Sequence, residues 1–110
     1  MKELTTYYTK KNILFKNISL IEPKVLGSRK KIEIYTATDI KSSYWAIFKI
    51  DSKSRFIRKN AQELLELYEK LKEYKDHNFK YKELVITSPL CSKAKTFLQE
   101  NDWRVRVDFM

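Results

Sequence analysis

The fold is decided by residues 31–53, which read KIEIYTATDIKSSYWAIFKIDSK and are followed by a segment with helical periodicity. Two runs in this stretch, Ile32–Thr38 and Tyr44–Ser52, are rich in β-branched and aromatic residues, and a polar segment around Lys41 separates them. Runs of this composition on either side of a polar turn are typical of a β-hairpin. We therefore expect two long antiparallel strands here.

The hairpin brings charged residues together at its open end. A turn centred on Ser42 places Glu33 directly opposite Asp51. Lys53 then lies one step further along the same face. Two opposed carboxylates repel each other unless a positive group lies between them. That group is a divalent metal ion or, alternatively, the ammonium of Lys49 or Lys53.

The rest of the chain predicts alternating helices and strands. Apolar residues recur at helical spacing from Asn60 to Tyr74, so this segment is expected to form a helix with one buried stripe. The short apolar run Leu84–Thr87 is typical of a central, parallel strand. Ser88 and the proline after it predict the start of a second helix, and the alternation over 104–109 predicts a final strand. With a further strand before the hairpin, this order indicates an α/β (α+β) fold: a strand meander, then helix, strand, helix and strand in a mixed β-sheet.

Length and composition exclude several classes of protein. A chain of 110 residues with 43% hydrophobic residues predicts a single domain over residues 1–110 with its own core. With one glycine, one cysteine and one histidine, it lacks the residues for a glycine-rich phosphate loop, a closed zinc site or an internal disulfide. No apolar run approaches the roughly 18 residues of a membrane span. We therefore expect no membrane partner and a cytoplasmic location.

Basic residues outnumber acidic ones and are unevenly distributed. The chain has 23 Lys and Arg against 14 Asp and Glu, a formal net charge of +9. A lysine-rich codon bias could produce this total, but it would not sort the charges by segment. Residues 24–59 hold ten basic and three acidic side chains, whereas residues 60–76 hold three basic and five acidic ones. A basic stretch beside a near-neutral helix favours a partner with a phosphate backbone, DNA or RNA.

The stretch Ile50-Asp-Ser-Lys-Ser-Arg55 lies on the second hairpin strand and directly precedes the long amphipathic helix. In this setting it resembles the PD-(D/E)xK nucleases, the superfamily of restriction endonucleases and archaeal Holliday-junction resolvases, over residues 31–109. The resemblance implies a restriction-endonuclease-like fold. It also implies a metal-dependent endodeoxyribonuclease, which hydrolyses phosphodiester bonds with Mg²⁺ or Mn²⁺ as cofactor.

The same resemblance implies roles for individual residues. Asp51 would be one metal ligand, and Lys53 would be the catalytic lysine. Glu33 would be the other metal ligand and would act with them in catalysis. Asp39 is the weaker alternative for this ligand, because it lies at the hairpin turn, far along the strand from Asp51.

Residues expected to contact nucleic acid surround these candidates. Tyr35 and Trp45 share the face of Glu33 and Asp51, where they would stack on bases or, alternatively, pack in the core. Contacts to the phosphate backbone, with a strong dependence on salt, are expected from the basic residues Lys30, Lys31, Lys49, Arg55, Arg58 and Lys59.

Three functions are compatible with these patterns. The first is a Mg²⁺-dependent endonuclease, which would act on duplex DNA as a homodimer because two strands need two sites. The second is a non-catalytic DNA-binding or RNA-binding module with a degenerate nuclease fold. The third is an accessory interaction subunit whose positive charge reflects composition alone.

Overall fold

A computed structural model describes residues 2–27, 32–76 and 78–107 of the chain. After an N-terminal helix, the described part follows the predicted order of a strand meander, then helix, strand, helix and strand. The elements are α1 (Lys2–Lys10), β1 (Phe15–Ile21), the short 3₁₀ helix η1 (Pro23–Leu26), β2 (Glu33–Asp39), β3 (Tyr44–Ile50), α2 (Arg58–Lys75), β4 (Tyr81–Ile86), α3 (Ser92–Glu100) and β5 (Trp103–Arg106).

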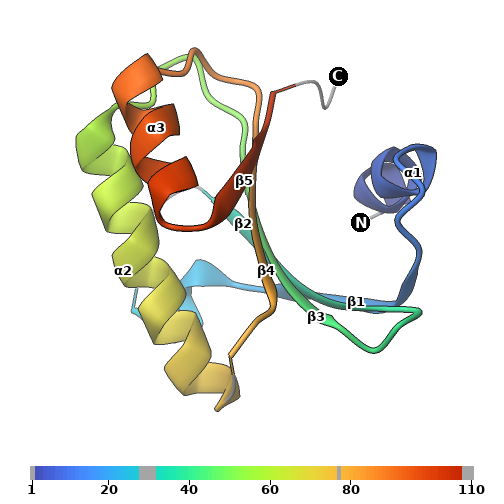
Figure 1. The fold of residues 1–110 in the computed structure, drawn as a ribbon. Coiled ribbons are helices and arrows are strands. Elements are labelled where there is room, and N and C mark those ends of the chain that lie inside the picture. Colours follow the sequence, from blue (N-terminus) through green and yellow to red (C-terminus); the bar gives the residue numbers. More distant parts are fainter. Residues whose placement is uncertain (1, 28–31, 77, 108–110) are drawn as a thin grey trace.

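The strands form one mixed sheet in the order β1-β2-β3-β4-β5. Strands β1, β2 and β3 pair antiparallel, and β3, β4 and β5 pair parallel. In Figure 1, α2 and α3 cover one face of the sheet, and α1 lies on the other. This is the mixed α+β architecture that the sequence predicts. Within the described part of the chain, none of the helices has the length and apolar character needed to cross a membrane.

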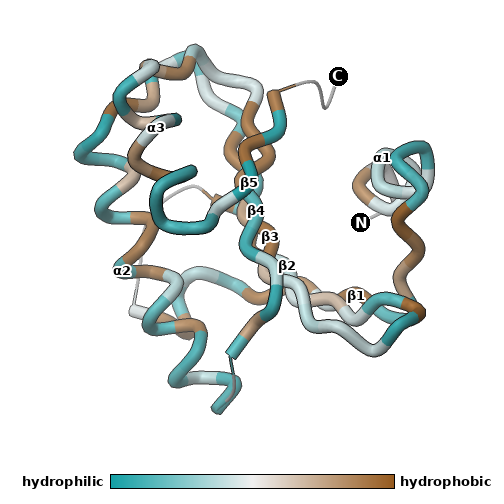
Figure 2. The backbone as a smooth tube through the Cα atoms, in the orientation of Figure 1, coloured by the Kyte–Doolittle hydropathy of each residue, from teal (hydrophilic) through white to brown (hydrophobic). Residues whose placement is uncertain are grey.

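The larger core lies between the sheet and the helices α2 and α3. Even-numbered strand residues such as Ile34, Phe48 and Leu84 are fully buried there. Leu64 and Leu71 of α2 are buried in the same cluster, because apolar residues at helical spacing share one face of the helix. Figure 2 shows this amphipathic pattern as hydrophobic and hydrophilic positions that alternate along α2.

Helix α1 closes a second, aromatic core on the other face of the sheet. Tyr8 is fully buried, and its ring packs edge to face on the rings of Phe15 and Trp45, with centroids 5.3 and 5.9 Å away. The odd-numbered strand residues Tyr35 and Ile47 belong to the same cluster. The N-terminal helix is therefore part of the fold, since it covers rings that the sheet would otherwise expose.

The hairpin of β2 and β3 pairs in a register two residues away from the expected one. Glu33 lies opposite Lys49 rather than opposite Asp51. The reason is the side chain of Asp39, whose Oδ1 accepts hydrogen bonds from two backbone N–H groups of the turn, both at 2.9 Å. These bonds close a tighter turn, centred on Lys41. Because the shift is an even number of residues, each side chain keeps its predicted face.

Helix α3 begins later than the sequence pattern predicts. The residues before it pair with the segment that precedes α2: the Phe56 N–H donates to the Pro89 carbonyl at 2.8 Å, and the Cys91 N–H donates to the Phe56 carbonyl at 2.9 Å. Residues 89–91 are thereby held in extended conformation, and Cys91 becomes the N-cap. Ser88 is therefore not a helix cap but the second residue after β4, which places it beside the site described next.

Candidate functional site

A pocket of about 320 Å³ lies where the parallel strands β3 and β4 end, between the segment that follows β3 and the first turns of α2. Asp51 follows β3 directly, and Thr87 and Ser88 follow β4. In sheets with parallel strands, ligands commonly bind in the crevice outside the carboxyl ends of the strands. Asp51 and Ser88 line the pocket, as do Asn60 and Glu63 from α2.

Asp51 is held by the neighbouring strand β4. The pairing of the two strands extends past their ends, because the Thr87 N–H donates to the Ile50 carbonyl at 3.0 Å. The Thr87 hydroxyl then donates to Asp51 Oδ1 at 2.8 Å. The carboxylate is thus fixed on the β4 side of β3, whereas Glu33 lies on β2, on its other side.

The first turn of α2 positions the other polar side chains of the pocket. The Asn60 Oδ1 accepts a hydrogen bond from the Ile57 N–H at 3.0 Å, and its Nδ2 donates to Glu63 Oε1 at 3.3 Å. The sequence pattern placed both residues in the predicted helix and assigned neither to a functional site. Both residues share the pocket with Asp51 because the loop after β3 leads directly into the first turn of α2.

Ser88 is the unusual member of this site. Its side chain is only 7% exposed, and its Oγ has no hydrogen-bond partner among the described residues. Buried polar groups are nearly always hydrogen-bonded, so an isolated hydroxyl in a pocket wall indicates a position that a water or a ligand atom fills.

The three residues predicted to form a catalytic centre have different surroundings in the structure. Glu33 Oε1 accepts a hydrogen bond from the Tyr35 hydroxyl at 2.9 Å, and its Oε2 lies 3.6 Å from Lys49 Nζ. Asp51 is bound to Thr87, and Lys53 is exposed in the following loop. The positive partner of Glu33 is therefore a lysine, the alternative to a metal ion that the sequence left open.

The structure therefore does not place Glu33 opposite Asp51, as the predicted magnesium site requires. Glu33 lies on β2, next to Tyr35 and Lys49, whereas Asp51 follows β3 on the side of β4 and is bound by Thr87. Within residues 2–27, 32–76 and 78–107, no three Asp, Glu, His or Cys side chains cluster closely enough to hold a metal ion.

Asp39, the weaker candidate for the metal, is a structural residue. Besides closing the turn, its Oδ2 accepts a hydrogen bond from Trp45 Nε1 at 2.9 Å. Its burial alone would raise the pKa of the carboxyl, but the hydrogen bonds from Trp45 and from the backbone of Ser43 and Lys41 lower it below its ordinary value. Its oxygens are thus already used inside the fold.

Three residues predicted to face nucleic acid are covered instead. Tyr35 and Trp45 are each 3% exposed beneath α1, so they pack in the core and offer no surface for stacking on bases. The side chain of Lys49 is 15% exposed and paired with Glu33. The amphipathic pattern of strands could not show this, because it does not reveal that α1 covers this face. Lys30 and Lys31 lie outside the described residues.

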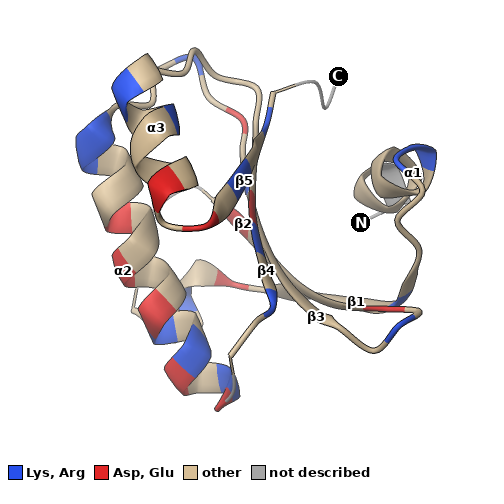
Figure 3. Ribbon diagram, viewed as in Figure 1, with Lys and Arg blue, Asp and Glu red and all other residues tan. Residues whose placement is uncertain are grey.

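A group of exposed cations, termed the rim of the pocket, lies at the entry to α2: Arg55 lines the pocket, and Arg58 and Lys59 follow it in the sequence. Arg55, Arg58 and Lys59 are exposed where the loop after β3 enters α2, and the Arg58 guanidinium stacks on the Phe97 ring of α3 at 5.2 Å. In the ribbon of Figure 3, Lys and Arg positions are coloured blue at the N-terminal ends of both α2 and α3, and acidic positions follow in red further along α2. Helix N-termini carry partial positive charge, so these ends of the helices favour a negatively charged ligand.

Comparison with known proteins supports the fold. No family model matches the sequence, and no curated protein matches it in sequence. Two solved structures are similar to it: EndoMS in its apo form, with 19% identity and a TM-score of 0.55 over 86% of this chain, and a repair endonuclease from Pyrococcus abyssi, with 18% identity and a TM-score of 0.51 over 84%. The matched regions span 37% and 38% of those chains. The chain thus has the restriction-endonuclease-like fold predicted from its resemblance to the PD-(D/E)xK nucleases.

Proposed function

We propose that this protein binds nucleic acid at the end of the sheet where β3 and β4 finish. The observation that carries this proposal is the set of exposed cations at the rim of the pocket, Arg55, Arg58 and Lys59, on a nuclease-like fold. Arginine and lysine at the N-terminal end of a helix suit phosphate oxygens both by charge and by hydrogen bonding. The net charge of +9 adds long-range attraction for a polyanion.

Phosphate contacts of this kind make binding dependent on salt. Each phosphate that the protein neutralises releases counterions, so affinity falls steeply between about 50 and 200 mM salt. The test is fluorescence anisotropy with labelled duplex and single-stranded DNA and RNA over this salt range. The double variant Arg55→Ala/Lys59→Ala should weaken binding by about tenfold or more and reduce the salt slope by roughly two.

A matched control separates this site from general charge attraction. The double variant Lys70→Ala/Lys75→Ala removes the same charge from the other end of α2. It should leave the salt slope close to that of the unchanged protein. Equal losses of affinity in the two double variants would show that the rim of the pocket is not the binding surface. An affinity that does not depend on salt would overturn the proposal.

Metal-dependent hydrolysis is the second candidate function. The shared fold with two endonucleases favours it, as does the presence of Asp51 and Glu63 in one pocket. One or two carboxylates suffice for Mg²⁺, which keeps several of its waters, and a bound metal ion would supply an activated water for phosphodiester cleavage. The trio Glu33, Asp51 and Lys53 does not support this function, because Glu33 is held by Tyr35 and Lys49.

A cleavage assay with Mg²⁺ or Mn²⁺ on duplex, single-stranded and branched DNA decides between the two. We expect the unchanged protein to bind without cutting. If Asp51→Asn and Glu63→Gln abolish cleavage while Glu33→Gln leaves it intact, hydrolysis at the pocket is established. Cleavage that Glu33→Gln also abolishes would restore the centre predicted from the sequence.

A further inference from the structure

The pocket at the ends of β3 and β4 has an apolar floor and a polar wall. Ile50, Phe56 and Leu64 contribute the apolar surface. The carboxylates of Asp51 and Glu63 line the same pocket. With a volume of about 320 Å³, the pocket lies at the small end of the range for ligand sites. It therefore suits one compact ring system rather than an extended molecule.

The polar wall consists mainly of hydrogen-bond acceptors. Asp51 uses one carboxylate oxygen for the Thr87 hydroxyl, which leaves the other oxygen without a hydrogen bond to any described residue. The Ser88 hydroxyl, 7% exposed, also has no partner among the described residues. The two carboxylates favour a ligand that donates hydrogen bonds, and they repel a phosphate that would enter the pocket itself.

The rim of the pocket has the opposite charge. Arg55 lines the pocket, and Arg58 and Lys59 follow it on the first turn of α2. A ligand that satisfies both parts has an anionic group outside, a flat apolar body within and an amino group at its inner end. A nucleotide whose base carries an exocyclic amino group combines these three properties.

We propose that the pocket holds one unpaired nucleobase of the bound nucleic acid and favours bases with an exocyclic amino group. Adenine, cytosine and guanine have this group, whereas thymine and uracil do not. The amino group donates to Asp51 or Glu63, the ring packs on the apolar floor, and the neighbouring phosphates lie against Arg55 and Lys59. The inference rests on the proposed binding of nucleic acid and identifies the substrate as single-stranded or locally unpaired.

The test uses four labelled single-stranded oligothymidylates that differ only at their central position, which holds thymine, cytosine, adenine or an abasic site. Because every other base is thymine, a shifted binding register cannot supply an amino group. The cytosine and adenine oligomers should bind about tenfold more tightly than the thymine oligomer, which corresponds to one good base contact. The abasic oligomer should bind no more tightly than the thymine oligomer.

Two conservative variants link this preference to the pocket. Glu63→Gln and Ser88→Ala should reduce the preference for cytosine over thymine while the salt slope stays unchanged. Ser19→Ala, at an exposed position on β1, is the matched control and should keep the full preference. A central 2-aminopurine should change its fluorescence on binding to the unchanged protein, and Glu63→Gln should diminish that change.

The outcomes separate this inference from the proposed function. Salt-dependent binding with equal affinity for all four oligomers would overturn the base pocket and leave nucleic-acid binding in place. No binding to any of the four oligomers would overturn the base pocket, and the proposed function would fall with it if duplex DNA and RNA also failed to bind. A preference for cytosine that appears only with Mn²⁺ present would show that the carboxylates hold a metal ion, and would also overturn the base pocket.

Discussion

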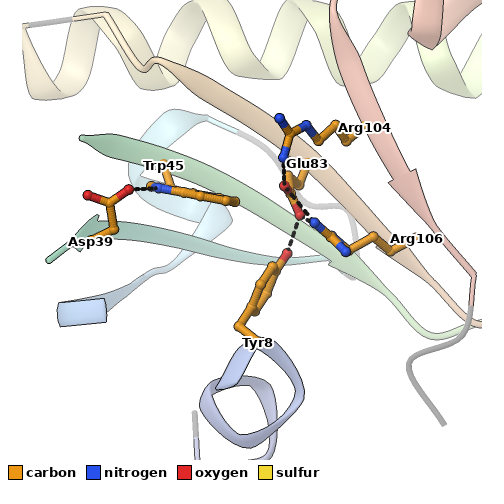
Figure 4. Close-up of polar contacts among 6 residues, drawn as sticks. All are labelled: Tyr8, Asp39, Trp45, Glu83, Arg104 and Arg106. Atoms are coloured by element: carbon orange, nitrogen blue, oxygen red, sulfur yellow. Dashed lines mark hydrogen bonds and ion pairs between the residues drawn. The ribbon is translucent and has the colours of Figure 1, made fainter. Parts of the chain in front are cut away.

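Two groups of polar side chains lie on opposite faces of the sheet, and they differ in how completely their hydrogen bonds are satisfied. Beneath α1, Glu83 is fully buried and accepts hydrogen bonds from the Tyr8 hydroxyl at 2.7 Å and from Arg106 Nε and Nη2 (Figure 4). Arg104 adds a further contact at 3.8 Å. In the pocket on the α2 side, the Ser88 hydroxyl has no such partner among the described residues.

The electrostatics of the Glu83 cluster follow from its burial. Removal from water raises the pKa of the Tyr8 hydroxyl above its ordinary value, and the charge of Glu83 and the hydrogen bond to it raise it further. Burial alone would lower the pKa of the Arg106 guanidinium, but its hydrogen bond and charge pairing with Glu83 raise it. The cluster therefore keeps Arg106 protonated and Tyr8 neutral.

This difference indicates what each group does. A buried carboxylate whose partners are all within the chain connects β4 to α1 and β5 and has little capacity left for a ligand. The pocket wall, in contrast, has a hydroxyl without a partner among the described residues and an exposed cationic rim. Its hydrogen bonding is therefore not completed by the chain itself. The same contrast places the candidate site on the α2 side of the sheet. The sequence had indicated the face of Tyr35 and Trp45, which α1 covers.

The largest expected effect comes from removing the buried carboxylate. Glu83→Ala leaves Arg106 and the Tyr8 hydroxyl without their partner in a covered site, so the free energy of unfolding should fall by about 3–5 kcal/mol. Urea denaturation at neutral pH measures it. Glu22→Ala is the control, since the side chain of Glu22 is 61% exposed and paired with Lys24, and its cost should stay under about 0.5 kcal/mol. Similar costs for the two variants would mean that the Glu83 cluster is not structural.

Asp39→Ala tests the second satisfied carboxylate. It leaves the buried Trp45 Nε1 without an acceptor and opens the hairpin turn. We therefore expect the free energy of unfolding to fall by about 2 kcal/mol. Because the folded protein lowers the pKa of Asp39, this stabilisation is present above the ordinary pKa of about 3.9 and is lost as pH falls below it. The difference in the free energy of unfolding between the unchanged and variant proteins should therefore shrink as the pH falls from neutral to about 3. A difference that is constant over this range would contradict the assigned role.

Tyr8→Phe should have a smaller effect, because Glu83 keeps both arginines and the ring stays packed. The lost hydrogen bond to a charged acceptor is worth about 1.5 kcal/mol. The folded-state pKa of Tyr8 is raised, so the unchanged protein loses stability as pH rises above about 10, where the unfolded chain releases the proton. Unfolding measured at pH of about 8 and 11 should show a steeper decline for the unchanged protein than for Tyr8→Phe. Parallel declines would show that Tyr8 does not titrate as inferred.

Much of the fold could be predicted from local patterns, because those patterns are determined by neighbours in sequence. The alternation in 32–38 and 44–52 predicted both strands and the face of each side chain, and the apolar spacing from Ala61 to Leu71 predicted the buried stripe of α2. The short apolar run at Leu84 predicted the parallel strand β4. These features do not depend on what lies far away in the chain.

The site was harder to predict because it depends on a few long-range contacts. The two-residue shift in hairpin register comes from the hydrogen bonds of one side chain, Asp39, and this shift separates Glu33 from Asp51. The late start of α3 comes from the pairing of Phe56 with residues on either side of Leu90, which no periodicity reveals. The sequence did contain one usable signal: polar residues follow both parallel strands, at Asp51 and at Thr87 and Ser88.

The smallest expected effect on stability provides the sharpest test of the contrast between the two faces. Ser88→Ala removes a buried hydroxyl that has no partner among the described residues, so the free energy of unfolding should stay the same or rise by up to about 1 kcal/mol. Thr87→Val is the matched comparison, because it removes the hydroxyl that binds Asp51 at 2.8 Å and should cost about 1 kcal/mol. If Ser88→Ala instead cost more than Thr87→Val, the Ser88 hydroxyl would be hydrogen-bonded to another group of the folded protein. The pocket wall would then be as complete as the Glu83 cluster, and the reason for placing a ligand there would be lost.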